Sequence, residues 1–124
     1  MATALHEMAQ AAGAALGIDV EAVPVFAETR AVCDALALDP MGLLASAAML
    51  AIVSADASAR VREALANVKI ACTAIGTVVS GPPRVILGGE DSAVPLPRFE
   101  RDELARFYDA QGEVRGMKSG AGGI

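Results

Sequence analysis

Apolar side chains recur at two spacings along this chain, and each spacing predicts a different element. A spacing of three or four residues is typical of an amphipathic helix, whereas alternation or a short wholly apolar run is typical of a strand. The helical spacing occurs in residues 2–16, 26–39, 54–68 and 98–110. The extended patterns occur in residues 18–25, 47–53, 69–80, 84–89 and 92–97. This order predicts an α/β (α+β) domain, in which a mixed β-sheet has helices packed on it.

The longest uncharged run, from Pro40 to Val53, decides whether a membrane segment is expected. It contains 14 residues, whereas a membrane-spanning helix needs about 20. We therefore expect no membrane association and interpret residues 47–53, AAMLAIV, as a central strand covered on both faces. On this interpretation, Met49→Asp would bury an unpaired charge and unfold the domain.

Composition narrows the class of protein. The 124 residues suit one domain, and the formal net charge is -5. This acidic balance argues against nucleic acid as a partner, because binding to the phosphate backbone needs clustered Lys and Arg.

Cys33 and Cys72 lie far apart and outside any ligand motif. We predict that both are small buried hydrophobes of a reduced, cytoplasmic protein.

The sequence offers no self-sufficient active site. P-loop, GxGxxG, HExxH and GxSxG patterns are all missing, so we predict no catalytic residue and no metal site in this chain. His6, the single histidine, is placed on the polar side of the first predicted helix and is interpreted as solvated. The acidic residues of ERDEL (100–104) suit the first turn of a helix. Glu90 and Asp91 suit a hairpin turn.

Two positions are candidates for contact with a ligand. Ser46 stands at the entry to the predicted central strand, where its hydroxyl could donate a hydrogen bond to a ligand. Gly76 lies inside a predicted strand and indicates a bulge or a close backbone approach. Packing is the simpler interpretation of both residues.

Four segments, in order and spacing, resemble the C-terminal domain of the AIR synthase (PurM-like) superfamily, where AIR is aminoimidazole ribonucleotide. They are TALHEMAQAAG (3–13), the block from VPVFAETR to VREAL (23–65), AIGTVVSGPPRVIL (74–87) and PLPRFERDEL (95–104). The resemblance covers about residues 2–108. It is closest to the AIR synthase-related proteins and the hydrogenase expression/formation proteins.

The resemblance implies a two-domain, ATP-dependent enzyme. In such proteins the N-terminal half carries an acidic metal-binding motif, supplies most of the ATP site and forms the dimer, and the C-terminal domain closes over the cleft. They use ATP and Mg²⁺ to phosphorylate an amide or related oxygen. On this basis residues 1–110 form an AIR synthase-related C-terminal domain without its N-terminal ATP-binding half. Residues 111–124 are expected to be a flexible, Gly-rich tail.

The resemblance also implies which residues line the cleft. Thr3 lies in the first turn of a helix that follows a glycine motif in relatives, and such a helix N-terminus is a good phosphate cradle. Ser46 and Ala47 lie in the loop that matches LLASAAML, and Gly76 follows in the AIGTVV segment. Relatives often have Gly where this chain has Ala47, so a methyl group stands where the backbone usually approaches closely. The ending GAGGI has no counterpart of the reactive Cys of the hydrogenase-maturation branch.

Two functions stay open on the sequence. In the first, the chain contributes cleft walls for substrate and nucleotide in an ATP-dependent ligase, dehydratase or kinase-like enzyme, of purine biosynthesis, hydrogenase maturation or a related pathway. The isolated chain is then inactive, and ATP with Mg²⁺ acts only in the full-length enzyme. In the second, it is a free-standing interaction or dimerisation domain that docks on a separate N-terminal half. Both predict a PurM-like N-terminal domain as partner, in the same or a separate chain, and a homodimer.

Overall fold

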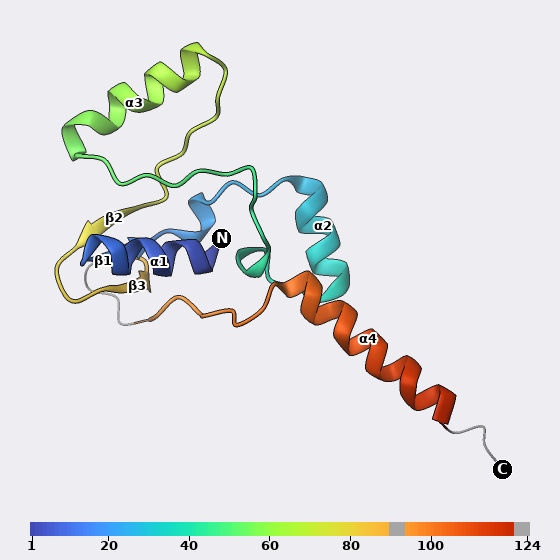
Figure 1. Cartoon of the computed structure of the whole chain (residues 1–124). Helices are drawn as coiled ribbons and strands as arrows, with labels where there is room; N and C mark the ends of the chain where they lie inside the picture. Colours follow the sequence, from blue (N-terminus) through green and yellow to red (C-terminus); the bar gives the residue numbers. More distant parts are fainter. Residues whose placement is uncertain (90–93, 121–124) are drawn as a thin grey trace. The chain divides into compact units, whose positions relative to one another are not determined.

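The computed structural model describes residues 1–89 and 94–120, with side chains described as far as residue 112 (Figure 1). Its helices are α1 (Ala2–Ala12), α2 (Ala27–Leu36), α3 (Ala55–Asn67) and α4 (Glu103–Gly120), with 3₁₀ turns η1 (Val20–Ala22) and η2 (Pro40–Gly42). Its strands are β1 (Ala15–Ile18), β2 (Gly76–Val79) and β3 (Arg84–Leu87). The chain divides into two compact units, which are described separately. The sheet unit is Ala4–Pro24 with Ala47–Pro97, and the helical unit is Met1–Thr3, Val25–Ser46 and Arg98–Ile124.

The sheet unit is built on a mixed sheet with the strand order β2-β1-β3. Strand β1 pairs antiparallel with β2 and parallel with β3. Apolar side chains of α1 and the strands make its core: Leu5, Ala9, Leu16, Ile18, Val85 and Ile86 are all buried. This α+β arrangement of helices and a mixed sheet confirms the predicted fold class.

The first helix ends earlier than the sequence predicts. Gly13 adopts φ +63°, a left-handed conformation that L side chains rarely take, and so α1 ends at Ala12 rather than near Leu16. The chain then enters β1, in which every residue is buried. The strand predicted over 18–25 is wrong beyond Ile18, because the Asp19 side chain accepts a hydrogen bond from the Glu21 amide and caps the turn η1.

The predicted central strand at 47–53 is also wrong. These residues have no regular secondary structure, and Met49 is 83% exposed. The physical reason lies in β1, whose two edges are already filled by β2 and β3. Residues 47–53 therefore cannot be the central strand of this sheet. Their apolar pattern does not indicate which strand, if any, they would pair with.

The other extended segments are shorter than predicted. Strand β2 covers only Gly76–Val79 of the expected 69–80, and β3 matches the prediction except for its two glycines. In place of an edge strand at 92–97, Pro95 forms an isolated bridge with Ile86. Proline has no N–H to extend a ladder. Residues 90–93, which include the predicted Glu90–Asp91 turn, lie outside the described residues.

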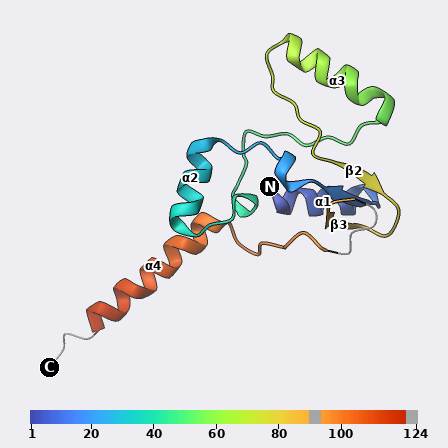
Figure 2. The same ribbon diagram turned by 180° about the vertical axis from the view of Figure 1, so that it is seen from behind.

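Helices α2, α3 and α4 confirm the predicted helices with shifted boundaries. Helix α2 ends where Ala37 takes the left-handed conformation at φ 52°. Helix α3 has no buried residue. Helix α4 extends away from α2 beyond its first turns (Figure 2) and continues to Gly120, past the predicted end at 110. The mobility expected for residues 111–124 stays a prediction. None of the helices within the described part of the chain is long and apolar enough to span a membrane.

Candidate functional site

The loop that leads to Ser46 is held by the first turn of α4, within the helical unit. The Glu103 side chain is buried, at 7% exposure. Its Oε2 accepts hydrogen bonds from the Asp39 amide at 3.1 Å and from Arg106 Nη2 at 2.9 Å, and its Oε1 accepts one from Arg106 Nε at 2.8 Å. The Arg106 guanidinium, and then the Asp39 amide, lower the pKa of Glu103 below its ordinary value. The carboxylate is therefore ionised and engaged at neutral pH.

Asp102 binds the same loop at a second point. Its Oδ2 accepts a hydrogen bond from the Leu44 amide at 2.7 Å. Its Oδ1 accepts from the amides of Leu104 and Ala105 at 3.0 and 3.3 Å, and so caps α4. One carboxylate thus joins the start of a helix to a loop 58 residues earlier in the chain.

Gly42 explains how α4 approaches the loop so closely. A Cβ atom on this residue would overlap the Cγ atom of Glu103 and the ring of Phe99. The turn η2 that contains Gly42 is itself capped by Asp39, whose Oδ1 accepts a hydrogen bond from the Met41 amide at 2.8 Å. Asp39 and Pro40 therefore shape the loop locally, and the missing side chain at Gly42 makes room for Glu103.

Met1, the residue before α1, also contacts this loop. The amino group of Met1 donates a hydrogen bond to the Leu43 carbonyl at 2.7 Å, and burial lowers the pKa of that amine. Thr3 and Ser46, two of the predicted cleft residues, therefore belong to neighbouring segments of the helical unit. Both side chains are exposed.

The other two predicted cleft residues lie in the sheet unit. Ala47 is exposed in the turn that follows Ser46, and Gly76 begins β2, where it pairs with Ile18. A Cβ on Gly76 would overlap the Gly17 carbonyl oxygen, so the close backbone approach expected there is present. Contact of these four residues with a ligand stays a prediction.

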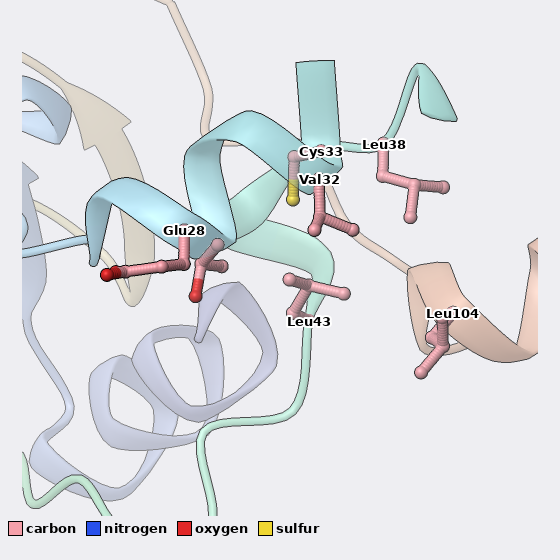
Figure 3. Close-up of a pocket in the computed structure, with 7 residues that line it drawn as sticks. Glu28, Val32, Cys33, Leu38, Leu43 and Leu104 are labelled. Atoms are coloured by element: carbon pink, nitrogen blue, oxygen red, sulfur yellow. The ribbon is translucent and has the colours of Figure 1, made fainter. Parts of the chain in front are cut away.

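A shallow apolar pocket of about 300 Å³ lies in the helical unit, beside the loop (Figure 3). Glu28 and Thr29 stand at its polar part, and its apolar lining is Val32, Cys33, Leu38, Leu43 and Leu104. Burial, followed by the nearby Asp34 carboxylate, raises the pKa of the Cys33 thiol. A protonated thiol is a poor nucleophile, so Cys33 behaves as the small buried hydrophobe that was predicted.

Two residue predictions are wrong. Cys72 is exposed rather than buried, because it lies in the irregular segment before β2. His6 is 8% exposed rather than solvated. The buried face of α1 runs through Ala2, Leu5, His6 and Ala9, which is rotated from the stripe suggested by its larger apolar residues. Neither ring nitrogen of His6 has a hydrogen-bond partner among the described residues.

Possible metal ligands were compared across the described residues. Within residues 1–89 and 94–120, no group of three His, Cys, Asp or Glu side chains could hold a metal ion.

The acidic residues of ERDEL were expected only to favour a helix N-terminus. Asp102 and Glu103 in addition bind amides of the loop at 39–44, a role that the sequence analysis missed. The sequence contains the residues involved, Asp39-Pro40 and Asp102-Glu103. It does not show which carboxylate binds which backbone amide.

Comparison with known proteins supplies the family. The family model for the C-terminal domain of AIR synthase related proteins matches residues 1–88. The match includes the first turn of α1, the loop at 39–46 and Gly76, and it ends before α4. Neither the comparison with curated proteins nor the one with solved structures gave a match. Since residues 1–88 are well over half of the 124, the chain belongs to the AIR synthase related family and carries its C-terminal domain.

Proposed function

We propose that this chain contributes cleft walls for substrate and nucleotide in an AIR synthase-related, ATP-dependent enzyme and is not catalytic alone. The observation that carries the proposal is the family match over residues 1–88. The loop before Ser46 supports it further, because this loop is held at both Asp39 and Leu44 while the Ser46 side chain is exposed. A fixed backbone with an exposed hydroxyl suits the wall of a binding site.

The side chains near this loop do not fit a magnesium site. A Mg²⁺ site needs carboxylate oxygens that are open to the ion. Both oxygens of Asp102 accept backbone amides, and both oxygens of Glu103 accept N–H groups of Asp39 or Arg106. We therefore assign Mg²⁺ and most of the ATP site to a PurM-like N-terminal half, on the same or another chain. No step of the reaction is assigned to residues of this chain.

The N-terminal half is the proposed partner, and the sheet unit offers it an apolar surface. Large apolar side chains that are more than 40% exposed occur on several segments of that unit: Met49, Ile52, Val53, Val68, Ile70, Val78 and Val94. Burial of such side chains against another protein would remove apolar area from water, and we propose that the N-terminal half covers them in the complete protein.

The test uses the purified 124-residue chain in two steps. Calorimetric titration with Mg²⁺-ATP is expected to show no binding to the chain alone, and ATP hydrolysis is expected to stay at background. Addition of a purified AIR synthase-related N-terminal half should then produce Mg²⁺-dependent turnover. Clear binding or turnover by the chain alone would contradict the proposal, and so would the lack of turnover with an N-terminal half that binds it.

The exposed apolar residues favour a second candidate function. A free-standing interaction domain would use the same surface to dimerise or to dock on a separately encoded half. The two functions differ in what the complex does. As a cleft wall, the chain takes part in ATP-dependent activity once an ATP-binding half is present. As an interaction domain, it forms its complex without nucleotide.

A further inference from the structure

The start of α4 acts directly on the loop before Ser46, which lies about 60 residues earlier in the chain. The match to the family model covers residues 1–88, and α4 begins at Glu103, after the matched residues. Asp102 and Glu103 bind the backbone at Leu44 and Asp39, inside the matched residues. The conformation of this loop therefore depends on two side chains that are distant from it in sequence.

The geometry goes beyond ordinary helix capping. A cap needs one oxygen, and Asp102 Oδ1 already accepts the amides of Leu104 and Ala105. Its Oδ2 is left for Leu44, at 2.7 Å. Glu103 makes its bond to Asp39 while almost fully buried and paired with Arg106. Hydrogen bonds to charged acceptors are stronger than neutral ones, so the loop is held at two amides five residues apart.

We propose that Asp102 and Glu103 are positioning residues for Ser46. By fixing the amides of Leu44 and Asp39, they set the path of the backbone that ends in the exposed Ser46 turn. This inference rests on the proposed function only in that Ser46 faces the substrate cleft. The holding of the loop itself is independent of what the cleft binds.

The first experiment measures the loop directly, by amide hydrogen exchange of the ¹⁵N-labelled chain. Asp102→Ser keeps a cap for α4, since Ser caps helices well, but lacks the second oxygen that reaches Leu44. Exchange at the Leu44 amide should rise roughly tenfold or more, as expected for loss of a charged hydrogen bond. The amides of Leu104 and Ala105 should keep their protection.

Asp109→Asn is the matched control, because it removes another carboxylate of the same helix. Asp109 is half-exposed and pairs with Arg101 rather than with the loop. Exchange at Leu44 should be unchanged in this variant. Unchanged exchange at Leu44 in both Asp102→Ser and Glu103→Gln would overturn the proposal, whatever the chain binds.

The second experiment asks whether the holding matters for Ser46 in the cleft. Mg²⁺-dependent turnover is measured with an N-terminal half, using Ser46→Ala, Asp102→Ser and the double variant. Residues that act through one another are non-additive. If Ser46→Ala lowers turnover about tenfold in the wild-type background, it should lower it less than about twofold with Asp102→Ser. Additive effects on turnover would overturn the positioning role. Absence of turnover in the wild-type mixture would instead count against the proposed function, and exchange at Leu44 would still decide the inference.

Discussion

At the scale of single residues, Glu103 is the side chain whose protonation matters most for the loop. It accepts hydrogen bonds from Asp39 and Arg106, and these partners lower its pKa below the ordinary value of 4.5. A group whose pKa is lower in the folded state stabilises that state above its unfolded pKa. The stabilisation is lost as the pH falls through the folded pKa. The contribution of Glu103 is therefore complete at neutral pH and disappears only below about pH 4.5.

This sign leads to a prediction for Glu103→Gln. At pH 7 the variant should be less stable than the wild type by roughly 1–2 kcal/mol, because a charged acceptor is replaced by a neutral one. The difference in unfolding free energy should shrink as the pH is lowered from 5 to 3. Urea unfolding followed by circular dichroism at several pH values measures it. Glu100→Gln, at an exposed position nearby, is the control. A difference between wild type and Glu103→Gln that stays constant down to pH 3 would contradict the interpretation.

At the scale of elements, the sequence predicted periodic segments better than pairing. Residues 27–36 and 55–67 are helical where a helical period was read, because an amphipathic pattern and its end signals are local. A mixed sheet was predicted, but the segments that form its strands were not all predicted correctly. Residues 47–53 and 85–87 are both apolar runs, and only the second pairs with β1. Which run joins a strand depends on contacts across the chain, and no pattern within the run encodes them.

The same argument applies to the candidate site. Ser46 and Gly76 were proposed as cleft residues from residue type and local setting, and their contact with a ligand stays a prediction. The roles of Asp102 and Glu103 were not predicted, since the Leu44 amide that Asp102 binds lies 58 residues away in the sequence. A carboxylate at the start of a helix is already explained by its favourable interaction with the helix dipole. The sequence therefore gives no reason to look for a second, distant partner. His6 shows the converse: its local setting suggested solvent, whereas tertiary packing buries it.

The irregular segment at 47–53 leads to a prediction that reverses the one drawn from sequence alone. Met49→Asp was expected to unfold the domain, but Met49 is 83% exposed. Substitution at an exposed site should change stability by less than about 0.5 kcal/mol. Val85→Asp, in β3 and 1% exposed, is the matched comparison and should cost about 4 kcal/mol or more by burying an unpaired charge. Thermal melts of the two variants decide it: loss of the folded transition in Met49→Asp would show that residues 47–53 form a buried strand after all.

At the scale of the whole molecule, many large apolar side chains of the described residues are exposed rather than buried in the core. Burial in the sheet unit is concentrated in α1, β1 and β3, while α3 has no buried residue and β2 is mostly exposed. Among the described residues β2 pairs with β1 alone, and an open strand edge beside exposed apolar residues favours association with another surface. In the absence of an N-terminal half, the available surface is a second copy of the same chain.

Self-association of the isolated chain is therefore expected to depend on the sheet unit. Two valines of nearly equal exposure allow a matched test: Val78 in β2 is 51% exposed and Val32 in α2 is 52% exposed. Lysine on an edge strand opposes pairing with another chain. Val78→Lys should raise the dissociation constant of the dimer by about tenfold or more, which corresponds to roughly 1.4 kcal/mol, whereas Val32→Lys should leave it nearly unchanged. Sedimentation velocity over a range of concentrations measures both. A dimer weakened only by Val32→Lys would place the contact on the helical unit, and a wild-type chain that stays monomeric at high concentration would contradict self-association altogether.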